Sequence, residues 1–402
     1  MVPEFSVRKS NNPFRLLNFL AVILAVLEAV RMVGFVQFEL SYILLLCLML
    51  IPIGQSLFGI KSIIKKSYVL FCLYLCFNLF ITNPAPVFNS WERLLMFIVL
   101  IGCVSPMISN KAQIYFRSRC FYIFICIMSV LSVSSCFCYF MGVNYFISPY
   151  GIIDYASFSG LFGGLFSQSM FLGPMAGISL CFMLWNYLRN HRIVFIILAV
   201  LSGGALLFSA SRSAVISTIC AIIVLIMLFY KKKTKALKFL MGAIFLMTVT
   251  FPLWESSLIG IVEKNDDNDK LGVYGSRTEK FEARMDEFED SPIYGIGFAS
   301  INPKGKDLYN HKTGTIEPGS SWLSTLSMTG IIGFLFVAFF ILNAFIIAKK
   351  SKTSIASLMA SLVLFFAIHM IFEGYIFAAG GPLCFIVWLV IGVASDLKYN
   401  RQ

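Results

Sequence analysis

Charged side chains are scarce in this sequence. Lys, Arg, Asp and Glu make up 13% of its 402 residues, whereas hydrophobic residues make up 58%. The mean hydropathy is +0.84, which is far above that of ordinary soluble domains and excludes one as the body of the protein. The apolar residues form blocks of roughly 15 to 25, the length that an α-helix needs to cross the hydrocarbon core of a bilayer.

These blocks predict an all-α fold, a polytopic transmembrane bundle of about twelve spans that forms one integral membrane domain over residues 1–402. The first block is flanked by Arg8, Lys9 and Arg15 and lacks a small-residue cleavage site. This pattern indicates a retained span and not a removed signal peptide. The expected spans are residues 14–34, 38–58, 67–82, 91–108, 119–141, 167–187, 192–209, 213–230, 236–254, 321–347, 353–372 and 378–395.

Basic residues predict the orientation of these spans. Alternate loops and both termini are rich in Lys and Arg, whereas the short loops of the other set carry only Arg31, Arg93 and Arg212. By the positive-inside rule both termini are cytoplasmic. The net charge of +12 therefore follows from topology, and because no basic domain is present we expect no nucleic-acid partner.

Metal and nucleotide motifs are also missing. All eleven cysteines fall inside or at the edges of apolar spans, which supports neither a zinc site nor a disulfide framework. The acidic run 266–269 lacks the Gly and Glu of a calcium loop, so a solvated turn is favoured over a calcium site. Gly295-Ile296-Gly297 follows no strand and is interpreted as a tight turn. We expect no metal and no cofactor.

Arg212 is the most informative single residue. It lies on the predicted outer side, between two apolar runs that are each long enough to cross the membrane. A cation at such a junction is costly unless it faces a protein interior or a watery cavity. We therefore interpret Arg212 as a functional group that holds phosphate.

The long outer segment, residues 255–320 between spans nine and ten, contains a predicted amphipathic helix. Ser276-Arg277-Thr278-Glu279 is a capping box, which starts a helix by satisfying its first amides. The helix should end near Asp290. Its acidic residues occupy one side, and the opposite stripe combines arginine with phenylalanine. The members of this stripe are Arg277, Phe281, Arg284 and Phe288. Either the arginine stems lie over lipid with their guanidinium groups at the headgroups, or the stripe closes a cavity into which arginine points.

Other polar residues on the outer side are weaker candidates. Glu317 precedes span ten and is either an exposed loop acid or a carboxylate at a cavity edge. His369 and Glu373 are one helical turn apart, so they form either a structural pair or part of an acceptor site. Arg93 opens span four and could line the same cavity. Glu28 and Arg31 are spaced for a local ion pair.

The order of these motifs resembles that of the bacterial O-antigen ligase/polymerase superfamily, over residues 155–395. A Ser-x-Ser-Arg-Ser segment ends at Ser213, and Arg277 stands fifteen residues before Pro292, which opens a Pro-Ile-Tyr-Gly-Ile-Gly turn. A Gly-Ser-Ser-Trp-Leu segment then enters span ten at Trp322. Ligases of the family carry a His before this last motif. Here Glu317 occupies the neighbourhood and His311 lies several residues earlier, a pattern more similar to polysaccharide polymerases.

The resemblance implies a GT-C-like glycosyltransferase in the bacterial inner membrane. Such enzymes transfer a glycan from undecaprenyl pyrophosphate to an acceptor glycan on the outer face, producing O-antigen, capsule or exopolysaccharide, with a flippase and a chain-length regulator as further partners. By motif position, Arg212 and Arg277 correspond to arginines that bind the pyrophosphate. A ligase acting on lipid A-core and a flippase for lipid-linked oligosaccharides remain the alternatives.

The residues themselves suggest a mechanism. Guanidinium groups stabilise the leaving pyrophosphate without a metal, a role expected of Arg212 and Arg277 with Arg284 in support. Glu317 would accept the proton of the acceptor hydroxyl as general base. One displacement would invert the anomeric carbon. His311, His369, Glu373 and Arg93 are expected around the acceptor.

Overall fold

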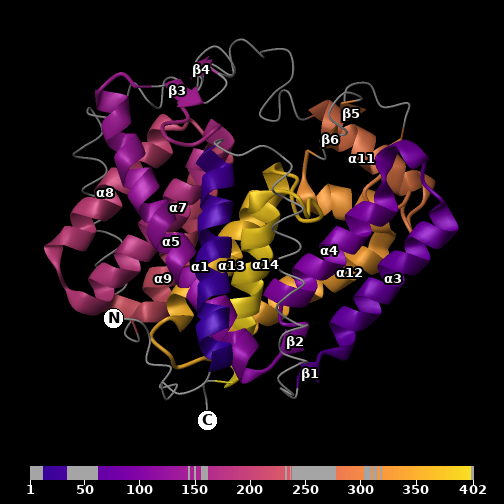
Figure 1. Cartoon of the computed structure of the whole chain (residues 1–402), viewed down its shortest axis with the longest axis horizontal. Helices are drawn as coiled ribbons and strands as arrows, with labels where there is room; N and C mark the ends of the chain where they lie inside the picture. The colour runs from indigo at the N-terminus through magenta and orange to yellow at the C-terminus, as the bar shows by residue number, and fades with distance from the viewer. Residues whose placement is uncertain are drawn as a thin grey trace.

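The computed structural model describes residues 12–33, 62–143, 145–148, 151–154, 162–230, 233–235, 237, 278–302, 309–310, 315–316 and 319–399. Over these residues the chain is a bundle of helices with three small antiparallel ribbons of two strands each (Figure 1). The predicted all-α, polytopic membrane fold is confirmed.

Most predicted spans correspond to helices. Residues 38–58 and 236–254 lie outside the described residues, apart from residue 237. Among the described residues, Pro86–Val104, α5, α7, α9 and α12 are each long and apolar enough to cross a bilayer alone, and α3, α8, α13 and α14 are shorter apolar helices. The bounds are α1 Asn12–Val33, α3 Lys66–Thr82, α4 Ser90–Val104, α5 Lys111–Phe140, α7 Ser169–Asn190, α8 Ile193–Phe208, α9 Arg212–Phe229, α12 Ser321–Lys350, α13 Ala356–Phe372 and α14 Pro382–Asp396.

The helices pack in two groups about a buried centre. Helices α5, α7, α8 and α9 lie together on one side, and α3, α4 and α12 lie on the other, with α13 and α14 between them (Figure 1). Every residue of α14 is buried. A helix that is apolar on all sides belongs in the interior of a bundle, and α14 therefore forms its core.

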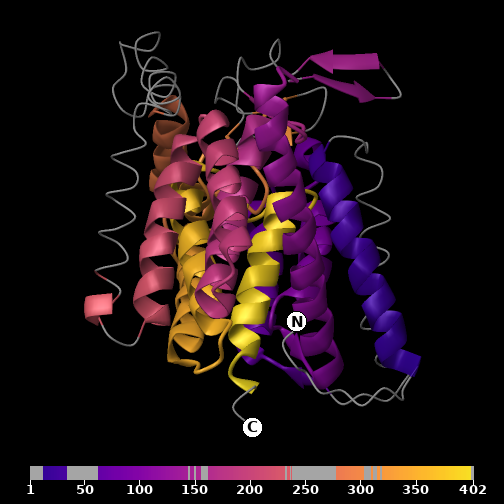
Figure 2. The same cartoon turned by 90° about the vertical axis from the view of Figure 1, so that its left-hand side faces the viewer.

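Short polar elements mark the two ends of the bundle. The helix α11 (Thr278–Asp290) and the ribbons β3–β4 (Tyr145–Ser148 with Gly151–Asp154) and β5–β6 (Tyr309–Asn310 with Thr315–Ile316) lie at one end (Figure 1). The ribbon β1–β2 (Ile63–Ile64 with Ile108–Ser109) and the end of α14 lie at the other. Figure 2 shows β3–β4 far from the end of α14. We refer to the α11 end as the outer end, following the predicted orientation.

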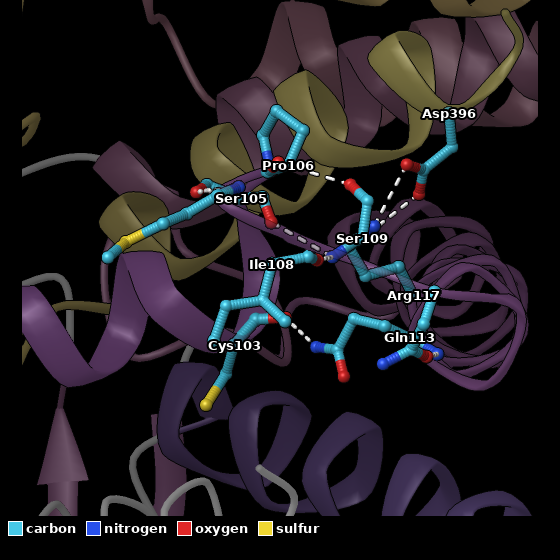
Figure 3. A network of polar contacts seen from close by, with 10 residues as sticks. Cys103, Ser105, Pro106, Ile108, Ser109, Gln113, Arg117 and Asp396 are labelled. Atoms are coloured by element: carbon cyan, nitrogen blue, oxygen red, sulfur yellow. Dashed lines mark hydrogen bonds and ion pairs between the residues drawn. The ribbon is translucent and has the colours of Figure 1, made fainter. Parts of the chain in front are cut away.

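A buried ion pair ties the inner end together. The Nε and Nη2 atoms of Arg117 donate to both carboxylate oxygens of Asp396 at 2.7 and 2.8 Å, and its Nη1 donates to the carbonyls of Ser105 and Ile108 at 2.9 Å (Figure 3). This bidentate geometry joins α5, α14 and the α4–α5 connection. Gly392 makes the approach possible, because a Cβ there would lie 2.1 Å from the Val104 carbonyl oxygen.

The same network corrects one predicted boundary. The span expected at 119–141 is α5, which begins at Lys111, so Arg117 and Arg119 lie inside the helix and not in a loop. Asn110 caps the helix by accepting the amide of Gln113 at 2.7 Å. The helix can include a cation because the charge of Arg117 is balanced by Asp396, a partner that only the folded chain supplies.

The outer half of the core is aromatic. The rings of Phe97, Phe298 and Phe377 contact one another with centroids 5.1–5.5 Å apart. Trp388 of α14 packs on Phe97 at 5.6 Å. Such pairs contribute beyond the area they bury. They hold two non-helical segments, residues 291–302 and 373–381, against the helices.

We expect Asp396→Ala to lower the stability of the purified protein by about 3–5 kcal/mol, because it leaves the Arg117 guanidinium buried without its counter-charge. Thermal unfolding in detergent measures the loss. The double variant Arg117→Met, Asp396→Leu removes both charges and should recover most of it. If Asp396→Ala melts like the wild type, the ion pair of Arg117 with Asp396 does not stabilise the fold.

Candidate functional site

Arg212 lies at the outer end, where α8 turns directly into α9. Ser209 ends α8 and donates its hydroxyl to the Leu206 carbonyl at 2.7 Å. Ala210 takes a left-handed conformation, with φ of 49°, and Arg212 is then the first residue of α9. Its side chain is half-buried. A guanidinium is thereby placed where the free amides and the dipole of a helix N-terminus already favour an anion.

A carboxylate lies beside this helix start. The Ser213 hydroxyl, one residue after Arg212, donates to Oε1 of Glu373 at 3.5 Å. Glu373 ends α13 in an extended conformation and is half-buried. Residues 160 positions apart in the sequence thus bring an arginine segment and an acid to one place.

The Gly-Ser-Ser-Trp motif bonds the start of α12 to the segment that contains Glu373. The Ser321 amide and hydroxyl both donate to the Glu373 carbonyl, at 3.0 and 2.7 Å, and the hydroxyl accepts the Tyr375 amide at 2.9 Å. Ser320 caps α12 by accepting the Leu323 amide at 3.4 Å. The two serines therefore set the positions of α12 and of the segment that follows Glu373.

His369 belongs to the supporting structure of this segment. It is buried, its Nδ1 lies 3.1 Å from the Tyr375 hydroxyl, and its ring stacks on Phe365. The predicted ion pair of Glu28 and Arg31 is confirmed at 3.0 Å, and Arg31 also donates to the Gly380 carbonyl. The Glu373–Gly381 segment is thus held from α1 as well as from α12.

Helix α12 is interrupted at Gly330, which has φ of 61° and ψ of −171°. Carbonyls released by the break are taken up by the Pro-Ile-Tyr-Gly-Ile-Gly turn: the amides of Ile296 and Gly297 donate to Ser327 and Met328 at 2.8 and 3.1 Å. In return, the Ile331 amide donates to the Pro292 carbonyl at 2.9 Å. The conspicuous turn in the sequence therefore completes the hydrogen bonds of a broken helix.

Two side chains of α3 complete this junction. The amide group of Asn78, fully buried, donates to the Tyr294 carbonyl at 2.5 Å and accepts the Phe298 amide at 2.8 Å. The Tyr74 hydroxyl donates to the Thr329 carbonyl at 2.5 Å. Sequence reasoning missed both residues, although a lone amide in the apolar run of α3 is a signal that could have revealed Asn78.

The predicted amphipathic helix is α11, and its acidic residues Glu279, Glu282, Asp286, Glu289 and Asp290 are exposed as expected. Arg284 is fully buried, but its Nη1 donates to Glu287 at 2.7 Å and to the Ser327 hydroxyl at 3.4 Å. Glu287 also accepts the Asn302 amide at 2.7 Å. Burial raises the pKa of Glu287 and lowers that of Arg284, and their mutual attraction opposes both shifts. The sequence analysis did not single out Glu287, which stands three residues after Arg284.

A groove of about 550 Å³ lies along α12, and its lining also includes Phe281 of α11 and Ile371 of α13. Its walls are apolar apart from one hydroxyl, and it is lined by Phe281, Ser320, Trp322, Leu323, Leu326, Phe334, Ala338 and Ile371. The groove therefore suits a hydrocarbon chain at the level where α12 begins.

The structure brings together only part of the predicted site. Arg212 is followed by Ser213, which bonds Glu373, whereas Arg284 donates to Glu287 of its own helix and to Ser327 of α12. Arg93 lies in the first turn of α4 and is half-buried. Arg277, His311 and Glu317 lie outside the described residues. Among the described residues, no cluster of His, Cys, Asp and Glu could hold a metal, and the described cysteines are all free.

Residues 197–338 match the family model described as O-antigen ligase. The match begins in α8 and ends within α12, and so contains the Arg212 segment, α11 and the Gly-Ser-Ser-Trp motif. No curated protein matches the chain. This match over residues 197–338 confirms the resemblance to the O-antigen ligase/polymerase superfamily. This family comprises glycosyltransferase-like membrane enzymes that act on lipid-linked oligosaccharides.

We expect Gly330→Ala to destabilise the protein by about 2–4 kcal/mol, because it imposes a left-handed conformation on a residue with a Cβ and adds a steric clash. That Cβ would lie 2.1 Å from the Ile293 carbonyl oxygen. Thermal unfolding measures the effect. Gly102→Ala is the matched control, since a Cβ at Gly102 meets no atom within 4 Å. If the two variants have the same melting temperature, the junction of α12 with the 292–297 turn does not require a glycine at position 330.

Proposed function

We propose that this protein polymerises lipid-linked oligosaccharide repeat units on the outer face of the bacterial inner membrane. It transfers the growing glycan from undecaprenyl pyrophosphate to a sugar hydroxyl of the acceptor. The observation that carries the proposal is the half-buried Arg212 at the N-terminus of α9, beside the carboxylate of Glu373. The product is O-antigen, capsule or exopolysaccharide, and both termini face the cytoplasm.

The phosphate-binding group combines two kinds of positive potential. Arg212 supplies a guanidinium, and the first amides of α9 supply oriented donors. Arg277, directly before the first residue of α11, supplies the second guanidinium. Groups that are fixed before the reaction stabilise the charge that develops on the leaving pyrophosphate, so the transfer needs no metal.

The transfer is a single displacement at the anomeric carbon. The acceptor oxygen forms a bond to that carbon while the bond to the pyrophosphate oxygen breaks, and the electron pair leaves with the pyrophosphate. The acceptor proton passes to a carboxylate. Glu317 is the first candidate for this base, and Glu373, which accepts a hydrogen bond from Ser213 next to Arg212, is the second. Attack from the opposite face inverts the carbon.

The alternatives are a ligase that uses lipid A-core and a flippase. The segment before Gly-Ser-Ser-Trp carries Glu317 where ligases carry a His, which favours polymerisation. Interrupted helices such as α12 also occur in transporters, where their free ends bind ions. Here the carbonyls of Ser327, Met328 and Thr329 are already bonded to the 292–297 turn and to Tyr74, which disfavours an ion site at the break.

We expect Arg212→Ala to abolish polymer in cells that lack the chromosomal gene, leaving surface glycan with a single repeat unit. Arg212→Lys keeps the charge without the bidentate fork and should retain only a small fraction of activity. Gel analysis of the surface glycan measures chain length, and exposed Arg189→Ala at the inner end is the control. Normal polymer from Arg212→Ala would refute the phosphate role, and complete loss of attached glycan upon gene deletion would indicate a ligase.

The base is identified by comparing Glu317→Gln with Glu373→Gln. Loss of a general base should reduce the transfer rate about 10²–10⁴-fold at neutral pH. It should also flatten the acidic limb of the pH–rate profile, because the rate falls there as the carboxylate becomes protonated. Transfer by purified protein between lipid-linked units, measured from pH 5 to 9, provides the profile. If both variants keep the wild-type profile, neither carboxylate is the base.

A further inference from the structure

The backbone of α7 lies directly against the turn that presents Arg212. Gly173 is buried in the second turn of α7. A Cβ at this position would lie 2.6 Å from the Ser211 Cβ and 3.0 Å from the hydroxyl oxygens of Ser209 and Ser211. Carbon atoms that are not bonded to each other rest about 3.5–4.0 Å apart. Any residue larger than glycine therefore displaces either α7 or the turn between α8 and α9.

Helix α7 supports this turn from both sides. Helices α8 and α9 pack little against each other, whereas α7 packs closely against both of them (Figure 1). Between α8 and α9, Ala210 has φ of 49°, a left-handed conformation that is strained for a residue with a Cβ. Such a conformation persists only where the surrounding structure fixes it. The contact with Gly173 is one of the interactions that fix it.

The position of the Arg212 guanidinium follows from this contact. Arg212 comes directly after Ser211, whose carbonyl accepts the first helical bond of α9 from the Val215 amide at 3.0 Å. The Ser211 hydroxyl also lies 3.4 Å from that of Ser213, which donates to the Glu373 carboxylate at 3.5 Å. A displacement of Ser211 therefore shifts the cation and also its position relative to the neighbouring acid.

We propose that Gly173 is a positioning residue for glycosyl transfer. The contact of its backbone with Ser211 sets the point at which Arg212 meets the pyrophosphate of the donor. The inference rests on the proposed function, because it requires that Arg212 binds this pyrophosphate. Fixed charges stabilise a transition state only where they are aimed at the developing charge, and a misplacement of about 1 Å can cost about 10²-fold in rate.

The test compares Gly173→Ala with Gly177→Ala, which adds the same methyl group one turn further along α7. A Cβ at Gly177 would lie 2.2 Å from the Thr218 hydroxyl oxygen and 3.1 Å from the Phe365 ring. Both variants thus disturb the packing of α7 and should lower the melting temperature. Only Gly173→Ala contacts the turn before Arg212.

The measurement is the rate of transfer between lipid-linked units by folded, purified full-length protein in detergent, at varied concentrations of these units. We expect kcat/KM to fall about 10–10²-fold in Gly173→Ala, because the guanidinium is displaced from the leaving pyrophosphate. In Gly177→Ala we expect kcat/KM to stay at the wild-type value, because the start of α9 keeps its place. A purely structural role of Gly173 would give both variants the same kcat/KM.

A compensating substitution separates position from folding. Ser211→Gly removes the Cβ that the added methyl group would meet. The Ser211 side chain makes no capping bond to α9, and glycine is well tolerated at a helix N-cap. The double variant Gly173→Ala, Ser211→Gly should therefore recover most of the lost kcat/KM. The same second substitution should bring no gain in Gly177→Ala.

An unchanged kcat/KM in Gly173→Ala would overturn the inference, as would a double variant that is no faster than Gly173→Ala alone. If Gly173→Ala does not fold, the double variant decides, because it must then fold and transfer at close to the wild-type rate. These failures leave the proposed function intact if Arg212→Ala still abolishes polymer. Polymer that persists in Arg212→Ala would instead overturn the phosphate role of Arg212 in the proposed function.

Discussion

The need to satisfy backbone polar groups in apolar surroundings shapes the outer half of this protein. Helix α12 breaks at Gly330, and the released carbonyls cannot turn to water within a packed bundle. The 292–297 turn, Asn78 and Tyr74 supply the missing partners. Because these partners come from α3 and from the segment that follows α11, the break joins both of them to α12.

Charged residues follow the same constraint. Arg117 is paired with the buried carboxylate of Asp396, and Arg31 is paired with that of Glu28, so that both cations join parts of the bundle. The polar groups at the outer end are arranged differently. Arg212 stands at a helix N-terminus, and Arg284 keeps one edge without a partner among the described residues. Arg117 and Arg31 hold helices together, whereas Arg212 is the cation to which our proposal assigns an anionic ligand.

Helix α12 connects these features because each of its faces has a separate role. One face, through Ser321, fixes the segment after Glu373 beside the start of α9. Another face, through Ser327, contacts Arg284 of α11. Helix α12 therefore links the segment that follows Glu373 to α11.

The sequence by itself determined the fold class, most span positions and the existence of α11, because hydrophobic length and a capping box act locally. It also placed Arg212 at a helix junction. It did not reveal that Arg117 is a core residue, since its partner Asp396 lies 279 positions away. The contact of Arg284 with Ser327, the approach of Glu373 to Ser213 and the bonding of the 292–297 turn to the break at Gly330 were decided by tertiary structure alone. Each depends on which helix faces become neighbours, and that arises only when the whole bundle packs.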